Sequence, residues 1–117
     1  MQATVRFIGS VRTPWQTLEE CPRNVSPEGP ACSLELEPAF AEGLRGLQAG
    51  NRILVLYWLD RADRENLLQQ RRDSSPVLGV FALRSPHRPT PIGAAVVKVE
   101  AIEGRRVRVR GIDCLDG

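Results

Sequence analysis

The chain has 117 residues, a net charge of +2, and a composition that is 42% hydrophobic and 26% charged. These values are typical of one ordinary globular domain, so they exclude an intrinsically disordered chain and a fibrous protein. The longest apolar run, residues 53–59, is far shorter than the roughly 20 residues that span a bilayer. The N-terminus resembles a strand rather than a basic and then apolar leader, so we expect a cytoplasmic protein without a membrane segment. The small positive charge permits an anionic partner but does not require one.

Three cysteines, Cys21, Cys32 and Cys114, are present, together with a single histidine, His87. They form no C-x-x-C pair, and a zinc site would need more ligands at closer spacing. We therefore expect no bound metal. A disulfide between Cys21 and Cys32 is conceivable, but reduced thiols without a special role are the preferred interpretation.

The first half of the chain predicts two strands and one short helix. Residues 3–11 indicate a strand with a kink at Gly9, and residues 12–31, with four prolines, indicate a long loop. Residues 32–37 alternate apolar and polar side chains, which is typical of a half-buried strand. Residues 39–47 place apolar side chains at helical spacing after a proline, and therefore predict a helix of two to three turns.

Three further segments follow in the middle of the chain. The continuous apolar run at residues 53–59 predicts a central strand that is buried on both faces. Residues 61–73 are rich in charge and in good helix formers, and predict a short exposed helix or an ordered loop. Residues 77–83 predict another apolar strand.

The C-terminal part predicts a hairpin with arms at residues 92–102 and 105–113 and a turn at Glu103 and Gly104. The second arm alternates arginine with valine, so its arginines line one face and its valines the other. A solvated outer face is the preferred interpretation of these arginines, and a stripe that contacts RNA is the alternative. The arginines are Arg106, Arg108 and Arg110.

These elements together predict an all-β protein, because short strands dominate and strands do not alternate with helices. We expect a small antiparallel or mixed β-barrel with long loops and one or two short helices. The whole chain, residues 1–117, is predicted to form a single domain. No G-x-G-x-x-G motif is present, which argues against a Rossmann type of nucleotide site.

One segment, residues 79–93, carries the chemistry. An apolar strand enters a loop that contains Pro86, Pro89 and Pro91, and a strand resumes at Ile92. Proline fixes φ and has no N–H, so this loop is stiff and leaves its carbonyls unpaired. A rigid polar loop between strands is suited to hold a ligand, since little entropy is lost on binding. From these residues alone, a purely structural crossover is an equally good interpretation.

The segment G-V-F-A-L-R-S-P-H-R-P-T-P-I-G resembles the signature G-V-F-A-T-R-S-P-x-R-P-N-P-I-G of the TsaA-like (YaeB-like, VirR-like) family. Other motifs agree in order and spacing. Residues 8–14 resemble the opening G-x-V-x-T/S-P, and residues 34–47 resemble L-x-L-x-P-x-x-x-x-G-L-x-G-L. Residues 55–63 match an apolar strand that ends in a polar residue, and residues 113–117 resemble D-L-L-D-G.

This resemblance implies a β-barrel that binds S-adenosylmethionine in a non-Rossmann manner, commonly as a homodimer. Characterised members of the family methylate N6 of threonylcarbamoyladenosine next to the anticodon of tRNA. The resemblance therefore implies an S-adenosylmethionine-dependent methyltransferase with tRNA as its substrate, and it places the signature loop at the cofactor. The implied cofactor contacts are Phe81, Leu83, Arg84, Ser85, Pro86, His87, Arg88, Pro89, Thr90, Pro91, Ile92, Gly93, Asp113, Leu115 and Asp116.

Roles can be assigned within this set by chemical type. Phe81, Leu83 and Ile92 are candidates for apolar contact with adenine. Arg84 and Arg88 are candidates for the methionine carboxylate or a substrate phosphate, because a guanidinium suits both. Asp60, Asp113 and Asp116 are candidates for polar contacts, and Asp60 is also a candidate base. The candidate catalytic residues are thus Asp60, Arg84 and Arg88, whereas His87 is interpreted as a surface loop residue.

The chain departs from the family pattern at several positions. Thr90 replaces the signature asparagine, Leu83 replaces a threonine, and Asp60 stands where the tRNA enzymes often have histidine. Family members also continue beyond the position of Gly117. These departures leave open an S-adenosylmethionine-binding protein that acts on another RNA or a small molecule. The arginines at positions 106, 108 and 110 leave open a second alternative, a non-catalytic RNA-binding barrel.

Overall fold

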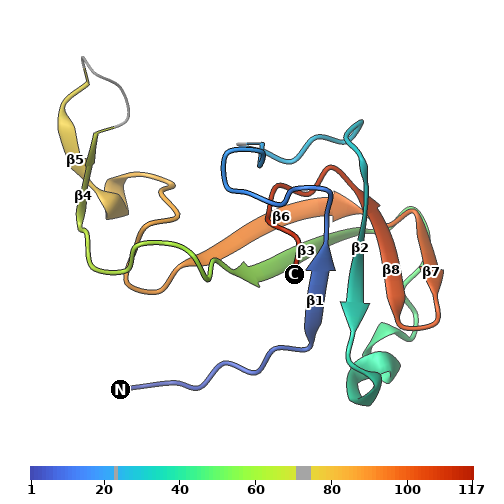
Figure 1. Ribbon diagram of the computed structural model, residues 1–117. Helices are drawn as coiled ribbons and strands as arrows, with labels where there is room; N and C mark the ends of the chain where they lie inside the picture. Colours follow the sequence, from blue (N-terminus) through green and yellow to red (C-terminus); the bar gives the residue numbers. More distant parts are fainter. Residues whose placement is uncertain (23, 71–74) are drawn as a thin grey trace. The chain divides into compact units, whose positions relative to one another are not determined.

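The computed structural model of the chain describes residues 1–22, 24–70 and 75–117. The chain folds into two compact units (Figure 1): a first unit of Met1–Leu54 with Ala95–Gly117, and a second unit of Val55–Ala94. The described elements in chain order are β1 (Gly9–Arg12), β2 (Ala31–Leu36), the 3-10 helix η1 (Pro38–Leu44), β3 (Arg52–Trp58), β4 (Leu68–Gln70), β5 (Val77–Gly79), the 3-10 helix η2 (Val80–Ala82), β6 (Ile92–Lys98), β7 (Ala101–Glu103) and β8 (Arg106–Arg110).

The first unit is built on a four-stranded antiparallel sheet with the strand order β1-β2-β8-β7 (Figure 1). Successive side chains of β8 point to opposite faces of the sheet. Val107 and Val109 are almost inaccessible to solvent, whereas the arginines that alternate with them are exposed. Cys32 and Leu36 of β2 are buried with the valines. The predicted division of β8 into an arginine face and a valine face is therefore confirmed.

The long loop between β1 and β2 is fastened to the C-terminal segment. Buried Thr13 donates from its hydroxyl to the Cys114 carbonyl (2.9 Å), and its amide donates to Asp116 Oδ1 (2.9 Å). The Trp15 indole donates to the Ile112 carbonyl (3.3 Å), and the Asp116 amide donates to the Trp15 carbonyl. The opening motif and the closing motif of the sequence thus satisfy each other's polar groups.

A second fastening of this loop lies at Gly111, where the backbone has a φ of +66°. The Ser26 amide donates to the Gly111 carbonyl, and the Gly111 amide donates to the Pro30 carbonyl, both at 2.9 Å. A Cβ atom at Gly111 would lie only 1.7 Å from the Ser26 carbonyl oxygen. Glycine is required here by both the left-handed backbone and the close approach of the loop.

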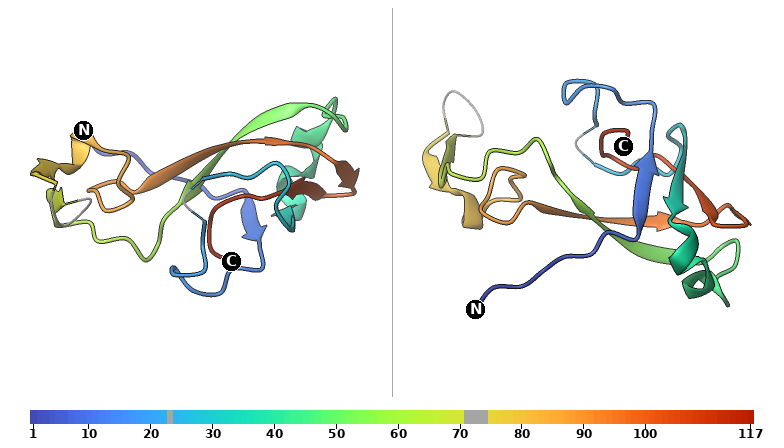
Figure 2. Two further views of the ribbon diagram at one scale, coloured as in Figure 1. Left: turned by 90° about the horizontal axis from the view of Figure 1, so that it is seen from above. Right: turned by 60° about the horizontal axis from the view of Figure 1, so that its bottom comes forward.

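Strands β3 and β6 pair with each other in a two-stranded sheet, and both cross the boundary between the units (Figures 1 and 2). The expectation that residues 53–59 are buried on both faces is wrong for this chain, because Leu54 and Leu56 are each 64% exposed. Val96 of β6 is exposed as well. The sequence pattern could not separate a strand covered on both faces from one whose second apolar face is left uncovered by the described residues.

Several predicted boundaries differ from the structure. The first strand begins only at Gly9, and residues 1–8 extend from it without regular structure (Figure 2). The predicted α-helix at residues 39–47 is the 3-10 helix η1. The charged segment at residues 61–73 forms a turn and then β4, although its residues 71–73 lie outside the described residues. The predicted hairpin arm at residues 92–102 is two strands, because Val99 leaves β6 to bond with Asn51 and Gly50.

The prediction of an all-β protein is confirmed, since strands dominate the described residues and the two helices are short. No closed barrel is found among the described strands, so the barrel stays a prediction, as does the single domain. Neither of these helices, of seven and three residues, is long enough to cross a membrane. The described Cys21, Cys32 and Cys114 are free thiols.

We expect Gly111→Ala to lower the free energy of unfolding by at least about 3 kcal/mol, because strain and a clash with the Ser26 carbonyl add together. Gly104→Ala is the matched control, since Gly104 also has a positive φ but faces open space. It should cost only about 1 kcal/mol. Urea denaturation of both variants measures the difference, and equal losses would refute the proposed close packing at Gly111.

Candidate functional site

The signature segment, residues 79–93, lies in the second unit. It leaves β5, turns through η2 and reaches β6 by way of the proline-rich loop. Strand β4 fixes its start, because Leu68 pairs with Gly79 and the Val80 amide donates to the Leu67 carbonyl (2.9 Å). Val80 is 1% exposed and anchors η2.

Arg88 points back into its own loop. Its Nη2 donates to the Val80 carbonyl (2.7 Å) and the Leu83 carbonyl (3.2 Å), and its guanidinium carbon lies 5.9 Å from the centre of the Phe81 ring. Its Nε is buried and has no hydrogen-bond partner among the described residues. Arg88 therefore closes the loop by bonding the carbonyl of the first residue of η2 and that of the residue just after it, a structural role that its position in the signature did not reveal.

Ser85 is the most buried polar residue of the loop, at 5% exposed. Its hydroxyl donates to Gln69 Oε1 on β4 and accepts the amide of His87 (3.1 Å). The hydroxyl thus joins the loop to the neighbouring hairpin. A buried polar group of this kind needs such partners, because leaving it unpaired costs about 1–3 kcal/mol.

His87 is half-buried, and its Nδ1 accepts a hydrogen bond from the Asp63 amide (2.9 Å). Asp63 Oδ1 in turn accepts the amides of Glu65 (2.9 Å) and Asn66 (3.2 Å). These two backbone bonds hold the pKa of the Asp63 carboxyl below its ordinary value. The turn at residues 63–66 is therefore an Asp-directed turn that aims the Asp63 amide at the histidine.

The end of the loop is tightly packed. Pro91 is fully buried, and its carbonyl accepts the Leu59 amide (2.9 Å). The Tyr57 ring lies so close to Gly93 that a Cβ atom there would be 2.3 Å from Cε2 of the ring. The final glycine of the signature is therefore a packing requirement.

The solvent-facing side of the loop presents a different set of groups. Phe81 is 74% exposed, Ile92 is 45% exposed, and Leu83 is half-buried between them in sequence. Arg84 and Asp60 are both exposed, and neither side chain makes a hydrogen bond or ion pair with the residues that the structure describes. The remaining predicted contacts with exposed side chains are Pro86, Pro89 and Thr90.

The other three predicted contacts, Asp113, Leu115 and Asp116, are half-buried and belong to the first unit. The carboxylate of Asp116 already accepts the Thr13 amide and lies 3.9 Å from Arg12. Desolvation by burial, with the nearby Asp113, raises the pKa of the Cys114 thiol to about 12, so this thiol is not an activated nucleophile.

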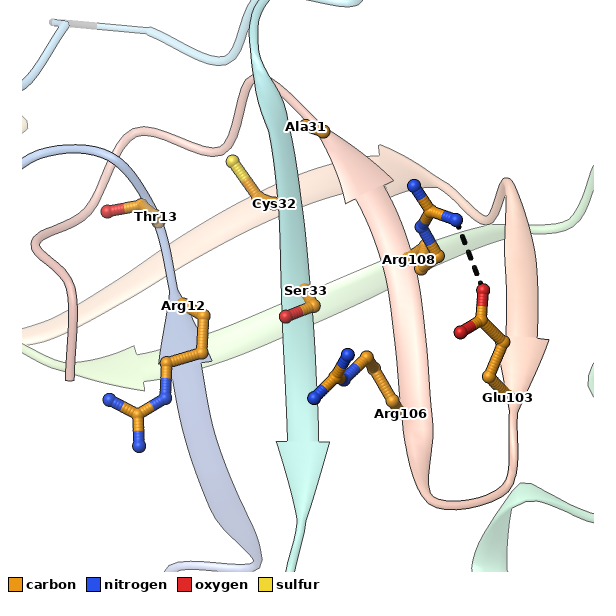
Figure 3. A pocket seen from close by; sticks show the side chains of 8 residues that line it. All are labelled: Arg12, Thr13, Ala31, Cys32, Ser33, Glu103, Arg106 and Arg108. Atoms are coloured by element: carbon orange, nitrogen blue, oxygen red, sulfur yellow. Dashed lines mark hydrogen bonds and ion pairs between the residues drawn. The ribbon is translucent and has the colours of Figure 1, made fainter.

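The arginine face of the four-stranded sheet carries an open pocket of about 500 Å³ (Figure 3). Its arginines are already paired with carboxylates, such as Arg106 with Glu35 (2.9 Å) and Arg108 with Glu103 (3.1 Å). Arg12 Nε lies 3.2 Å from the Glu35 carboxylate, and Arg12 together with Arg106 lowers the pKa of the Glu35 carboxyl. Arg110 pairs with Glu100. The pairing makes this face an ion-pair surface with little net charge, as expected for a solvated outer face.

The sequence analysis missed four residues that hold the signature loop: Trp58, Asp63, Arg64 and Gln69. Arg64 donates from Nε to the Pro89 carbonyl (3.0 Å), and its guanidinium lies 5.3 Å from the centre of the Trp58 ring. The available signal was the Asp and Asn content of residues 61–66, which favours turns over a helix. Within the described ranges no group of three or more His, Cys, Asp or Glu side chains could hold a metal ion.

Comparison with known proteins agrees with this architecture. A family model described as the tRNA-methyltransferase O N-terminal domain matches residues 10–117, and the chain belongs to this family. The resemblance seen in the sequence motifs is thereby confirmed. A probable S-adenosyl-L-methionine-binding protein VirR from Rhizobium radiobacter is 44% identical over 115 residues, which cover 98% of this chain and 66% of VirR.

An S-adenosyl-L-methionine-binding protein from Archaeoglobus fulgidus is 36% identical over 110 residues, 94% of this chain and 79% of that protein. A crystal structure of TrmO from Pseudomonas aeruginosa is also similar, with a TM-score of 0.76 and 34% identity. The match covers 100% of this chain and 52% of the TrmO chain. The chain therefore spans about half the length of that TrmO structure and about two thirds of VirR.

We expect Arg88→Met to lower the free energy of unfolding by about 2 kcal/mol, because it removes charge-assisted bonds to the Val80 and Leu83 carbonyls. Arg84→Met is the control, and should change stability by less than about 0.5 kcal/mol since Arg84 is exposed and unpaired. Thermal and urea unfolding measure both. Similar effects of the two substitutions would contradict the structural role of Arg88.

Proposed function

We propose that this chain is an S-adenosylmethionine-dependent methyltransferase that methylates N6 of threonylcarbamoyladenosine next to the anticodon of tRNA. The observation that carries the proposal is the signature loop, which combines a rigid backbone with an exposed phenylalanine and an unpaired arginine, Arg84. Membership of the tRNA-methyltransferase O family and the names of the relatives support the cofactor. A tRNA substrate implies a cytoplasmic enzyme, and we propose that it acts as a homodimer.

The residues of the loop fit the proposed cofactor in chemical type. Phe81 offers an exposed aromatic face for adenine, and Leu83 and Ile92 add apolar surface. Arg84 offers a guanidinium with no carboxylate partner, which suits the methionine carboxylate. The buried Arg88 Nε is a further donor that is not used within the chain. The loop therefore holds an apolar surface and a cation within a few residues, on a backbone that is already ordered.

When bound, S-adenosylmethionine would supply an electrophilic methyl group: the attacking nitrogen would form a bond to the methyl carbon as the bond from that carbon to sulfur breaks, with S-adenosylhomocysteine as the leaving group. The protein contributes mainly by positioning and electrostatics, because this displacement needs no covalent intermediate. We propose that Arg84 binds the carboxylate, that Phe81 orients the adenine, and that Arg88 keeps the loop in shape. Asp60, an exposed carboxylate without an internal partner, is the candidate acceptor for the proton that the methylated nitrogen releases.

The remaining implied contacts keep a place in this proposal. Asp113 and Leu115 stay cofactor contacts that the family resemblance implies, whereas Asp116 accepts the Thr13 amide within the first unit. Ser85 and His87 are proposed to act by holding the loop rather than by touching the ligand.

One alternative methyl acceptor is supported by the amino-acid sequence. Thr90 replaces the signature asparagine and is exposed, so another RNA or a small molecule is a second candidate acceptor. The non-catalytic RNA-binding alternative gains nothing from the arginine face, because its arginines are paired with carboxylates.

Isothermal titration of the purified chain with S-adenosylmethionine and S-adenosylhomocysteine tests the cofactor. We expect saturable binding of one ligand per chain. Methyl transfer is then followed with tRNA that contains threonylcarbamoyladenosine, with the same tRNA lacking this modification as control. Binding without transfer to either tRNA would favour the alternative acceptors, and absence of binding by a folded chain would refute the proposal.

We expect Arg84→Gln to weaken S-adenosylhomocysteine binding by about tenfold or more, which corresponds to about 1.4 kcal/mol, because a charge-assisted contact to the carboxylate is lost. The matched control is Arg61→Gln, since Arg61 also belongs to the second unit, is exposed, and has no hydrogen bond or ion pair with the described part of the chain. That variant should bind within about twofold of the parent chain. Equal affinities in both variants would remove Arg84 from the site.

A further inference from the structure

The signature loop is held by a neighbouring stretch of chain, residues 58–69, which we name the brace. Both belong to the second unit. Besides the backbone contacts of Leu67 and Leu68 with Val80 and Gly79, four further contacts join them: the Leu59 amide to the Pro91 carbonyl, the Asp63 amide to His87 Nδ1, Arg64 Nε to the Pro89 carbonyl, and the Ser85 hydroxyl to Gln69 Oε1. The contacts reach the loop at nearly every second residue from 85 to 91.

The loop needs this help because of its composition. Pro86, Pro89 and Pro91 have no N–H, so the loop cannot form a regular ladder of its own. Two of the carbonyls that remain, those of Pro89 and Pro91, receive donors from the brace. The conformation of the loop therefore depends on residues outside the signature.

His87 is the one place where the bond runs to a titratable ring. Since Nδ1 accepts from the Asp63 amide, the imidazole is neutral and its proton is on Nε2. The carboxylate of Asp63 is occupied by the Glu65 and Asn66 amides, and this fixes the direction of the Asp63 N–H. The Asp63 N–H is thus a backbone donor of fixed direction, and Nδ1 of His87 is the acceptor that satisfies it.

Arg64 is the second anchor of the brace. Its guanidinium lies over the Trp58 ring, which limits the positions that Nε can take, and Nε then bonds the Pro89 carbonyl. Arg64 and Pro89 also line an open pocket of about 580 Å³, together with Glu65 and Leu67. The Trp58 ring therefore limits the position of the Arg64 guanidinium, and Arg64 Nε in turn fixes the loop at the Pro89 carbonyl.

We propose that His87 and Arg64 are positioning residues for the cofactor site, and that they act by fixing the loop that presents Phe81 and Arg84. The proposal rests on the proposed function, because it explains how that site stays ordered before a ligand arrives. It assigns His87 a role through Nδ1, as an acceptor, and none as a catalytic base.

Two substitutions separate this role from direct contact with the ligand. In His87→Asn, the side-chain oxygen can take the place of Nδ1 as an acceptor, whereas in His87→Gln the polar group is moved toward the former position of Nε2. We expect His87→Asn to bind S-adenosylhomocysteine within about twofold of the parent chain, and His87→Gln to bind about five- to tenfold more weakly. Arg64→Lys, which lacks the Nε donor, should resemble His87→Gln.

Isothermal titration with S-adenosylhomocysteine measures these affinities, and unfolding midpoints confirm that each variant is folded. Amide exchange of Asp63 gives a readout that is independent of the ligand: it should be faster in His87→Gln than in His87→Asn. Retained binding in Gln with loss in Asn would assign His87 to ligand contact and overturn the proposal, as would equal affinities in all variants. If the parent chain binds no cofactor, the proposed function itself fails; if it binds and the order above is violated, only the positioning role fails.

Discussion

The second unit depends on one constraint: a loop with three prolines cannot satisfy its own backbone. Each proline removes a donor, and the carbonyls that remain must find partners elsewhere. Arg88 supplies donors from inside the loop, and the brace supplies them from outside. The same arrangement leaves Phe81, which contacts the Arg88 guanidinium, and Arg84 largely exposed to solvent. Because the carbonyls of the loop are bonded by Arg88 and the brace, other side chains of the loop can face solvent and form a surface suited to a ligand.

The first unit has a different constraint: the long loop between β1 and β2 must be held in place by contacts outside its small sheet. Backbone bonds from Ser26 and Gly111, and the buried hydroxyl of Thr13, fasten that loop to the C-terminal segment. Burial of the β8 valines supplies the apolar core, and ion pairs cover the opposite face. Because those charges compensate one another, the sheet presents little field to a distant polyanion. Long-range attraction of the proposed tRNA substrate would have to come from arginines outside this face.

The sequence predicted the strands that alternate and the family to which the chain belongs. The period of two in residues 32–37 and 105–113 reports which side faces a core, and the structure agrees. The prediction was wrong for residues 53–59, which were expected to be buried on both faces. An apolar run does not show whether other residues cover both faces of the strand, and here one face is exposed. For the charged segment at residues 61–73 the sequence left a short helix and an ordered loop open; the described part is an Asp-directed turn followed by the short strand β4, which the sequence did not predict. Arg88 could be recognised as part of the site, but its inward direction depends on carbonyls that only the folded loop brings near it.

The packing of the loop also explains where the chain is free to differ from its relatives. Gly93 lies under the Tyr57 ring and admits no side chain, so this position of the signature cannot drift. Thr90, where the signature has asparagine, is exposed; its carbonyl accepts the Ile92 amide (2.9 Å), but its side chain makes no hydrogen bond to the residues that the structure describes. A change at Thr90 therefore leaves the scaffold intact, and any effect it has must fall on what the loop meets. The two positions, three residues apart, divide the signature into a part constrained by folding and a part open to selection for a new acceptor.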